Sequence, residues 1–210
     1  MFRRHWELWL AALVAALTVL AMATWSHAGG IPARAHQYRS ALIRCARFEW
    51  GLSAPVATFA AQVHQESAWN PDARSPYADG LAQFTPATAD WLPEVAPQVG
   101  KADPFNPGWA LRALTAYDLY LWQRVRAVTD CERMAKTLSA YNGGLGWLRR
   151  DERLAAAQGL DPARWWNQVA AVNAGRAPWA IKENRAYPHR ILLLLEPRYE
   201  AAGWGKGMCP

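Results

Sequence analysis

The 210-residue chain carries 23 Lys and Arg against 17 Asp and Glu, which gives a net charge of +6, and 52% of its residues are hydrophobic. This hydrophobic share excludes a disordered chain, the 14 glycines without a three-residue period exclude a collagen, and three cysteines are too few for a disulfide-built miniprotein. The positive charge suits a polyanionic partner, such as nucleic acid, acidic lipid headgroups or an anionic cell wall. The 13 Trp residues supply flat rings that pack in cores and also stack on sugars.

Residues 1–28 have the order of a secretory signal peptide. Two arginines precede an uncharged run over 8–23, and Ser26 and Ala28 place small residues before a possible cleavage point. As a helix this run would span about 24 Å, short of the roughly 30 Å of a bilayer core. Extension of the uncharged run to Ser26 makes an uncleaved signal anchor the alternative, and both interpretations predict export.

Proline and capping signals predict an all-α domain over 40–205, preceded by a short linker at 29–39 and followed by a tail at 206–210. No run of alternating strand residues and no internal repeat is present. We expect helices over 39–50, 56–67, 85–92, 107–128, 131–144, 162–175 and 188–203, with Asp130 as one cap and Pro188 as the start of the last helix.

Three cysteines allow at most one internal bridge, and export permits it. Cys45 follows the core spacing of its helix, so we expect it to be a small buried residue. Cys131 opens a helix, and Cys209 lies in a glycine-rich tail that has no core of its own. The sequence therefore favours a Cys131–Cys209 disulfide and a free Cys45.

One carboxylate, Glu66, is the candidate reactive group. No His or Cys spacing fits a metal site, and no phosphate-binding glycine loop follows a strand, so neither metal nor cofactor is expected. Glu66 ends an apolar helix, where burial and the negative end of the helix dipole both raise a carboxyl pKa. A raised pKa would let it donate a proton near neutral pH. A surface glutamate at a helix end is the simpler alternative.

Five ordered motifs around and beyond Glu66 resemble the soluble lytic transglycosylase family. They cover about residues 40–200 and are E-S-A-W-N-P from Glu66, G-L-A-Q-F-T-P-A-T-A from Gly80, D-P-F-N from Asp103, A-Y-N-G-G from Ala140 and E-N-R-A-Y from Glu183. The resemblance implies a goose-type lysozyme-like fold in a single catalytic domain. It also implies cleavage of the β-1,4 bond between MurNAc and GlcNAc in peptidoglycan, in the periplasm.

The resemblance also implies roles for individual residues. Glu66 would protonate the glycosidic oxygen and then act as base toward the C6 hydroxyl of MurNAc, which closes a 1,6-anhydro ring. Ser67 would orient Glu66 or the N-acetyl group, and the sugar cleft would be lined by Gln83, Tyr141, Asn142 and Tyr187. This reaction needs no second carboxylate, in contrast with the hydrolases that use two. Asp79 is the one acid near the Gly80 turn that could serve as a second, although a turn residue is the simpler interpretation.

The sequence departs from the family pattern at a few positions. Ala82 replaces the usual Met and would trim one wall of the cleft, and Trp69 and Asn184 replace Phe and Thr. The loop from Ser75 to Gly80 is one residue shorter than usual. These departures affect the positioning of substrate more than the chemistry.

Other functions remain open at this point. A lysozyme-type hydrolase (N-acetylmuramidase) would give reducing ends, and a non-catalytic wall-binding domain would give no turnover. A basic nucleic-acid binder accounts for the charge, but the export signal argues against it. We expect a monomer that acts on peptidoglycan glycan strands and is soluble or anchored to the inner membrane. Wall remodelling, assembly of a secretion apparatus and phage lysis are all compatible roles.

Overall fold

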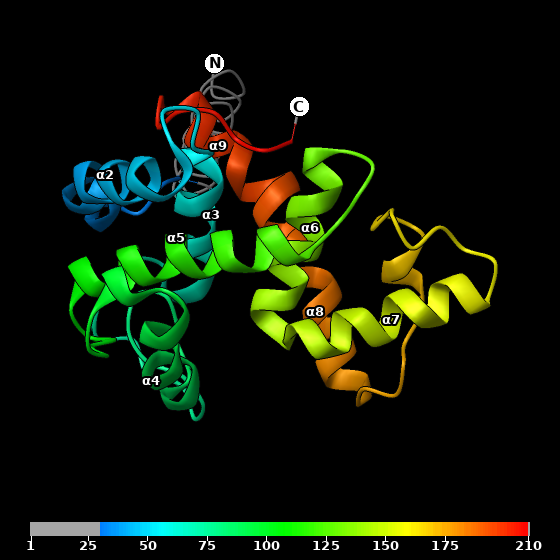
Figure 1. Cartoon of the computed structure of the whole chain (residues 1–210). Coiled ribbons are helices and arrows are strands. Elements are labelled where there is room, and N and C mark those ends of the chain that lie inside the picture. The colour runs from blue at the N-terminus through cyan, green and yellow to red at the C-terminus, as the bar shows by residue number, and fades with distance from the viewer. Residues whose placement is uncertain (1–29, 210) are drawn as a thin grey trace, which may run out of the picture. The chain divides into compact units, whose positions relative to one another are not determined.

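The computed structural model describes residues 30–209, so the predicted signal segment over 1–28 lies outside the described residues. The described chain is helical, with isolated β-bridges but no strand, which confirms the all-α class. None of its helices is long and apolar enough to cross a membrane. Figure 1 shows the elements η1 (Ala33–Tyr38), α2 (Arg39–Trp50), α3 (Val56–Ser67), α4 (Pro86–Val95), η2 (Pro97–Val99), α5 (Pro107–Arg124), α6 (Asp130–Gly143), α7 (Leu145–Ala157), η3 (Val169–Ala171), α8 (Pro178–His189), η4 (Arg190–Leu195) and α9 (Glu196–Ala201).

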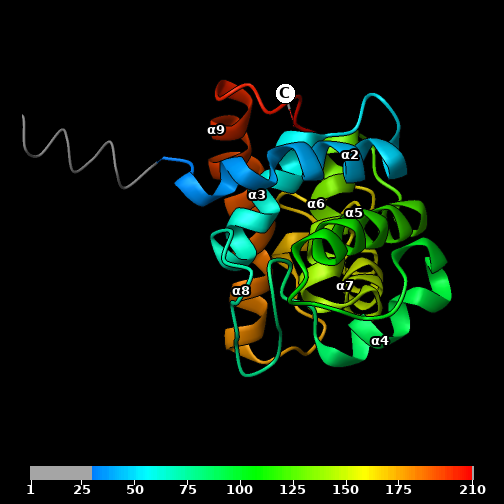
Figure 2. The ribbon, with the colours of Figure 1, turned by 90° about the vertical axis from the view of Figure 1, so that its left-hand side faces the viewer.

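Two helices, α3 and α6, form the centre of the domain. Every residue from Val56 to Val63 of α3 is buried, as is every residue from Met134 to Ala140 of α6. Helices that are buried all round need neighbours on every side. Accordingly α6 contacts α5, α7 and α8, while α3 contacts α2, η4 and α9 (Figure 2). The C-terminal turns of these two helices carry Glu66 and the Tyr141–Asn142 pair.

Several predicted helix boundaries agree with the structure. Helices α2 and α3 span 39–50 and 56–67 as expected, and α4 and α5 begin at the prolines that follow Thr85 and Asn106. The Thr85 hydroxyl accepts a hydrogen bond from the Thr88 amide, and the Asn106 side chain accepts from two amides of α5. The cap of α6 is Thr129, which accepts from the Glu132 amide, so the assignment of Asp130 as the cap was wrong.

The segments after α6 differ from the prediction. The helix expected over 162–175 is absent except for η3, because the side chain of Glu132 binds the main-chain amides of Trp165 and Trp166 at 2.5 and 3.2 Å and so replaces helical hydrogen bonds. Helices α7 and α8 were missed. Pro188 lies inside α8 rather than at its start, and the chain continues through the π-helical η4 into α9.

Residues 33–38 of the expected linker form the helical turn η1. Ala35 is fully buried, and the ring of Tyr38 stacks on Trp69 with an interplanar angle of 6°. The apolar and aromatic side chains of this segment thus give it a place in the core. The linker assignment was wrong for this part of the segment.

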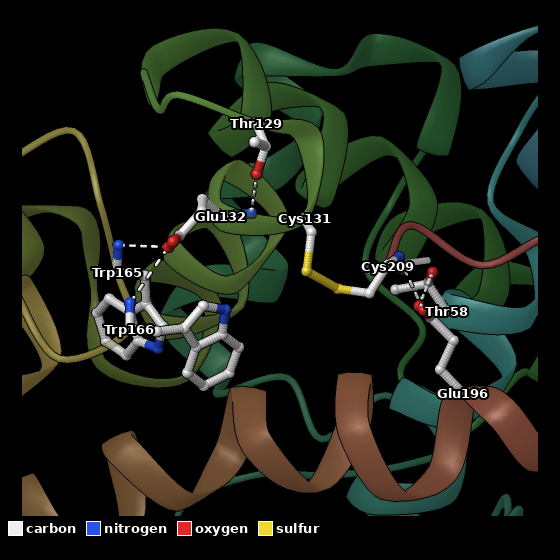
Figure 3. Close-up of a disulfide and its surroundings, with 8 residues drawn as sticks. All are labelled: Thr58, Thr129, Cys131, Glu132, Trp165, Trp166, Glu196 and Cys209. Atoms are coloured by element: carbon white, nitrogen blue, oxygen red, sulfur yellow. Dashed lines mark hydrogen bonds between the residues drawn. A yellow bond between two sulfur atoms is a disulfide. The ribbon is translucent and has the colours of Figure 1, made fainter.

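The bridge favoured from the sequence is present in the structure. Cys131 and Cys209 form a disulfide that closes a separation of 78 residues (Figure 3). Cys45 is free but only half-buried. Beside the bridge, the Glu196 carboxylate accepts hydrogen bonds from the Thr58 hydroxyl and from the Cys209 amide. The C-terminal segment is therefore held both to α6 and to α3.

We predict that loss of this bridge destabilises the domain. A closed loop of this length is worth up to about 4 kcal/mol in the chain-entropy model. Replacement of both Cys131 and Cys209 by Ser should therefore lower the Tm by about 5 °C or more, as measured by calorimetry.

The matched control is Cys45→Ser, which removes a thiol but no bridge and should leave the Tm within about 1 °C. Peptide mapping without reductant should recover the Cys131–Cys209 pair. Recovery of a bridged Cys45 would contradict the assignment.

Candidate active site

A cleft of about 650 Å³ opens above the C-terminal ends of α3 and α6. Its walls come from the loop over 75–85, from α5 and α6, and from the start of α8. Glu66 lies at its floor, and aromatic rings of Phe84, Tyr117 and Tyr141 pack together at its side. A long cleft of mixed aromatic and polar lining suits a sugar polymer, because pyranose faces stack on rings while hydroxyls take hydrogen bonds.

Glu66 is half-buried, and the hydrogen-bonding partner of its carboxyl is Tyr187. The Tyr187 hydroxyl, on α8, donates to Oε1 of Glu66. The pKa of Glu66 is raised to about 8, chiefly by burial of the carboxyl; the Tyr187 hydrogen bond opposes this rise, the nearby Glu183 adds to it, and Arg190 lowers the pKa. At neutral pH the Glu66 side chain therefore carries a proton that it can donate into the cleft.

The backbone turns sharply directly after Glu66 and Ser67. Ala68 and Trp69 adopt positive φ angles of 48° and 66°, a conformation that side-chain-bearing residues rarely take. Complete burial of the Trp69 ring compensates for this strain: it stacks on Tyr38, and its Nε1 donates to the Tyr199 hydroxyl at 2.6 Å. The turn keeps Glu66 at the last turn of α3, facing the cleft.

The loop that carries the G-L-A-Q motif is held in place through its main-chain groups. Gly80 has φ of 76°, and a Cβ at this position would lie 1.8 Å from the carbonyl oxygen of Pro104. Only glycine therefore allows this loop to meet the D-P-F-N segment. The Ser67 hydroxyl donates to the Leu81 carbonyl at 2.9 Å, and the Tyr141 hydroxyl donates to the Ala82 carbonyl at 2.7 Å.

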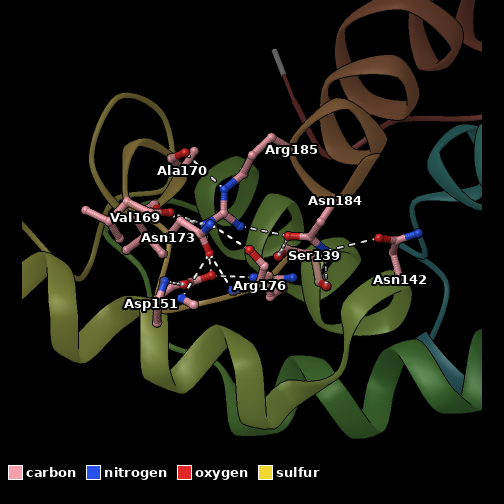
Figure 4. A network of polar contacts seen from close by, with 12 residues as sticks. Ser139, Asn142, Asp151, Val169, Ala170, Asn173, Arg176, Asn184 and Arg185 are labelled. Carbon is pink, nitrogen blue, oxygen red and sulfur yellow. Dashed lines mark hydrogen bonds and ion pairs between the residues drawn. The ribbon is translucent and has the colours of Figure 1, made fainter. Parts of the chain in front are cut away.

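The amide of Asn142 is oriented by a chain of hydrogen bonds. Arg185 and the Ser139 hydroxyl both donate to Oδ1 of Asn184, at 2.7 and 2.9 Å, which fixes the direction of the Asn184 amide. Its Nδ2 then donates to Oδ1 of Asn142 at 3.1 Å. Figure 4 shows the nitrogen of Asn142 turned away from this contact. Asn142 thus presents an N–H donor at the cleft.

A buried ionic cluster supports this end of the cleft. The carboxylate of Asp151, on α7, binds the guanidinium groups of Arg176 and Arg185, the latter at 2.8 Å (Figure 4). Arg176 also lines the cleft beside Gly143, where a Cβ would lie 2.6 Å from Nη1 of Arg176. A Cβ at Gly144, the second glycine of the A-Y-N-G-G motif, would meet no such contact. The absence of a side chain at Gly143 is therefore what makes room for the cluster.

The structure brings together only part of the predicted site. Glu66, Gln83, Tyr141 and Asn142 line the cleft as expected. The other two predicted residues do not line it: Ser67 binds the Leu81 carbonyl rather than Glu66, and Tyr187 lies behind Glu66 as its hydrogen-bond donor.

Two further expectations need correction. Ala82 is fully buried and does not line the cleft, so its small side chain does not open a cleft wall; its carbonyl instead receives the Tyr141 hydroxyl. Asp79 does not line the cleft either. Its main chain forms isolated β-bridges with Arg74 and Phe84, directly before the turn that begins at Gly80.

Some lining residues had no assigned role in the sequence. Trp147 and Trp179 provide large rings, Tyr117 adds a third, and Glu183 is a second carboxylate, which pairs with Arg190. The E-N-R-A-Y motif marked the position of Glu183 without giving its role. Within residues 30–209, no group of three or more His, Cys, Asp or Glu could hold a metal ion.

The family model described as "Transglycosylase SLT domain" matches residues 47–162, more than half of the chain. The chain belongs to the transglycosylase SLT family. The match includes Glu66, the G-L-A-Q motif and the Tyr141–Asn142 pair, whereas Tyr187 and Glu183 lie beyond it. The sequence resemblance to soluble lytic transglycosylases is thereby confirmed.

Curated relatives are similar over the same region. Membrane-bound lytic murein transglycosylase F of Shewanella halifaxensis (strain HAW-EB4) is 36% identical over 108 residues, which are 50% of this chain and 21% of that protein. The protein of the same name from Maricaulis maris (strain MCS10) is 37% identical over 120 residues, which are 56% of this chain and 24% of that protein. The chain thus spans about a quarter or less of the length of these relatives.

Solved structures confirm the expected fold. The 70 kDa soluble lytic transglycosylase SLT70 from Escherichia coli superposes with a TM-score of 0.60 at 24% identity, over 80% of this chain and 25% of that one. The complex of the 70-kDa soluble lytic transglycosylase with bulgecin A gives a TM-score of 0.58 over 82% of this chain and 25% of that one.

We predict that Tyr187→Phe moves the alkaline limb of the pH–rate profile to higher pH. The wild-type kcat/KM on purified sacculi should fall as the pH rises through about 8, because Glu66 then loses its proton. The Tyr187 hydroxyl stabilises the Glu66 carboxylate, so its removal raises the pKa of Glu66 further. The rate at the optimum should also fall, because the ionised form of Glu66 loses its donor.

The matched control is Tyr120→Phe, since Tyr120 does not line the cleft, its hydroxyl forms no hydrogen bond with the described residues, and Phe keeps its ring contacts. It should leave the profile unchanged. A limb that moves to lower pH in Tyr187→Phe would show that the tyrosine does not stabilise the carboxylate.

Proposed function

We propose that this chain is a peptidoglycan lytic transglycosylase in which Glu66 is the acid and the base. The observation that carries the proposal is a half-buried carboxyl, with a pKa raised to about 8, at the floor of an aromatic-lined cleft. The substrate is the glycan strand, cut at the β-1,4 bond between MurNAc and GlcNAc. We infer action in the periplasm by a monomer, without cofactor, metal or nucleic acid.

In the first step Glu66 donates its proton to the glycosidic oxygen, and the bond between that oxygen and C1 of MurNAc breaks. A glutamic acid with a pKa of about 8 is suited to this task near neutral pH. The positive charge that develops at C1 faces the Glu66 carboxylate just formed. Proton donation by a positioned acid of this kind typically contributes about 10² to 10⁴-fold to a rate.

In the second step the C6 hydroxyl of the same MurNAc attacks C1, and its proton passes to Glu66. The bond from O6 to C1 closes the 1,6-anhydro ring, and Glu66 regains the proton that it gave. During the interval the Tyr187 hydroxyl stabilises the carboxylate. No water enters the reaction, so no second carboxylate is needed to activate one.

Lysozyme-type hydrolysis is the second candidate, and Glu183 is the observation that favours it. Glu183 lines the cleft and raises the pKa of Glu66 by its negative charge. It is therefore close enough to Glu66 to be the second carboxylate that a hydrolase uses to activate water. Its ion pair with Arg190 engages the carboxylate elsewhere, which supports the transglycosylase reaction instead. The N-terminal segment, cleaved or kept as an inner-membrane anchor, would export the enzyme for wall remodelling, for secretion-apparatus assembly or for phage lysis.

We predict that Glu66→Gln abolishes turnover while the protein stays folded. The amide keeps the shape of the side chain but has no acidic proton to transfer to the glycosidic oxygen. The release of muropeptides from sacculi should therefore fall by at least a hundredfold. Wild-type products should lack a reducing end, so borohydride should leave their masses unchanged. Products that borohydride reduces would instead assign the chain to the hydrolases.

Thermal unfolding provides the folding control for this variant. The native state holds the Glu66 proton up to a pH of about 8, whereas the unfolded chain releases it near pH 4.3. Stability therefore falls as the pH rises between these values. Glu66→Gln should be the more stable protein at pH 7, by as much as about 3 kcal/mol, and should match the wild type near pH 4.

We predict different effects of removing the two other acids near the cleft. Asp79→Asn should retain activity within about tenfold, because this side chain is outside the cleft and forms no hydrogen bond or ion pair with the described residues. Glu183→Gln should lower the pKa of Glu66, because it removes a neighbouring negative charge, and the products should stay anhydro-terminated.

Product analysis by mass spectrometry checks both variants in parallel with Glu66→Gln. A loss in Glu183→Gln as severe as that in Glu66→Gln, with reducing ends in the wild type, would favour water activation by Glu183. The same loss in Asp79→Asn would give that role to Asp79.

A further inference from the structure

Asp118 is an ionisable residue that the proposed reaction does not use. It lies on α5, is fully buried, and forms no ion pair with any residue in 30–209. The hydrogen-bond partner of its side chain is Gln62 of α3, which is fully buried as well. Nε2 of Gln62 donates to Oδ1 of Asp118 over 3.4 Å, a long hydrogen bond.

Each member of this pair has one further polar atom that lacks a partner among the described residues. These atoms are Oδ2 of Asp118 and Oε1 of Gln62, and both are buried. If Asp118 were ionised, both atoms would be acceptors without a donor, and a buried charge would have no cation to balance it. A single proton on Asp118 removes both difficulties, because its O–H can donate to the amide oxygen.

We propose that Asp118 is a positioning residue that stays uncharged and pairs reciprocally with Gln62, holding α3 to α5 one turn before Glu66. Oδ2–H of Asp118 donates to Oε1 of Gln62, while Nε2 of Gln62 donates to Oδ1 of Asp118. Each of the four polar atoms of the two side chains then has a hydrogen-bond partner. Burial raises the pKa of Asp118 well above its usual range, the Gln62 hydrogen bond opposes this, and the nearby Glu66 raises it further.

The uncharged state matters for Glu66, which ionises once in each cycle of the proposed mechanism. The titratable groups that surround Asp118 are Glu66 on α3, Tyr141 on α6, Tyr187 on α8 and Tyr117 beside it on α5. None of them is a cation. A carboxylate at position 118 would therefore oppose the ionisation of Glu66, and an uncharged pair does not. This consequence rests on the proposed function.

Two variants at position 118 test the pairing. Asp118→Asn keeps both hydrogen bonds, because its amide can donate to Gln62 and accept from it, and it should retain at least about a third of the wild-type kcat/KM. Its alkaline limb should stay within about 0.3 pH unit of the wild type. Asp118→Leu removes both hydrogen bonds, so kcat should fall at least about tenfold while KM changes less than threefold. An alkaline limb lowered by about one unit in Asp118→Asn would show that the wild-type residue is ionised, and would overturn the proposal.

Gln62→Glu tests the same pairing from α3. Two facing carboxyls share one proton, so this variant places a negative charge one turn before Glu66. The alkaline limb should move up by about one pH unit. Gln123→Glu is the matched control, because it adds the same charge at an exposed position of α5, and it should not move the limb. An unmoved limb in Gln62→Glu would overturn the proposal.

A measurement without turnover separates this inference from the proposed function. In the Glu66→Gln background, Asp118→Asn should raise the Tm by an amount that grows from near zero at pH 4 to at least about 3 °C at pH 8. The reason is that the unfolded chain releases the Asp118 proton near pH 3.9 while the native state keeps it. A gain that is constant with pH would show an ionised Asp118. Failure of the product analysis would refute the proposed function and leave this result unaffected.

Discussion

The site depends on the burial of one carboxyl at the end of an apolar helix. Burial is what keeps the proton on Glu66 near neutral pH, and the same burial makes the ionised form expensive. The surrounding groups reduce that expense without removing it: a tyrosine hydroxyl donates to the carboxyl from α8, and the backbone turn after Ser67 keeps the side chain at the cleft floor. In the proposed mechanism, packing and hydrogen bonds within one small region thus balance the acid strength of Glu66 against its base strength.

Contacts with main-chain groups fit the loop with the G-L-A-Q motif to its neighbours in the cleft. The Gly80 backbone lies against Pro104, while Ser67 and Tyr141 use their hydroxyls on the carbonyls of the intervening loop. The sequence motifs suggest a set of sugar contacts. In the structure, several motif residues instead fit the loop over 75–85 to its neighbours. Ser67 illustrates the difference, because its hydroxyl serves the loop and not the acid.

The fold class, the first helices and the place of Glu66 at the end of α3 could be predicted because their signals are local. Proline and threonine caps mark α4 and α5, and an apolar run ending in Glu66 marks α3. The region after α6 could not be predicted in this way. There the Glu132 carboxylate accepts hydrogen bonds from the main-chain amides of Trp165 and Trp166. The ion pairs of Asp151 join residues from α7, the following loop and α8. Such long-range polar contacts override local propensity and leave no periodic pattern.

The disulfide has a consequence for how the domain is made. Cys209 follows α9 in the chain, so every described helix must be synthesised before the bridge to Cys131 can close. A chain that stops short of Cys209 would keep a free thiol on α6, the helix whose far end presents Tyr141 and Asn142. The bridge can therefore form only in a chain translated through α9 and then oxidised, and it fixes the segment after α9 to the helix that carries Tyr141 and Asn142.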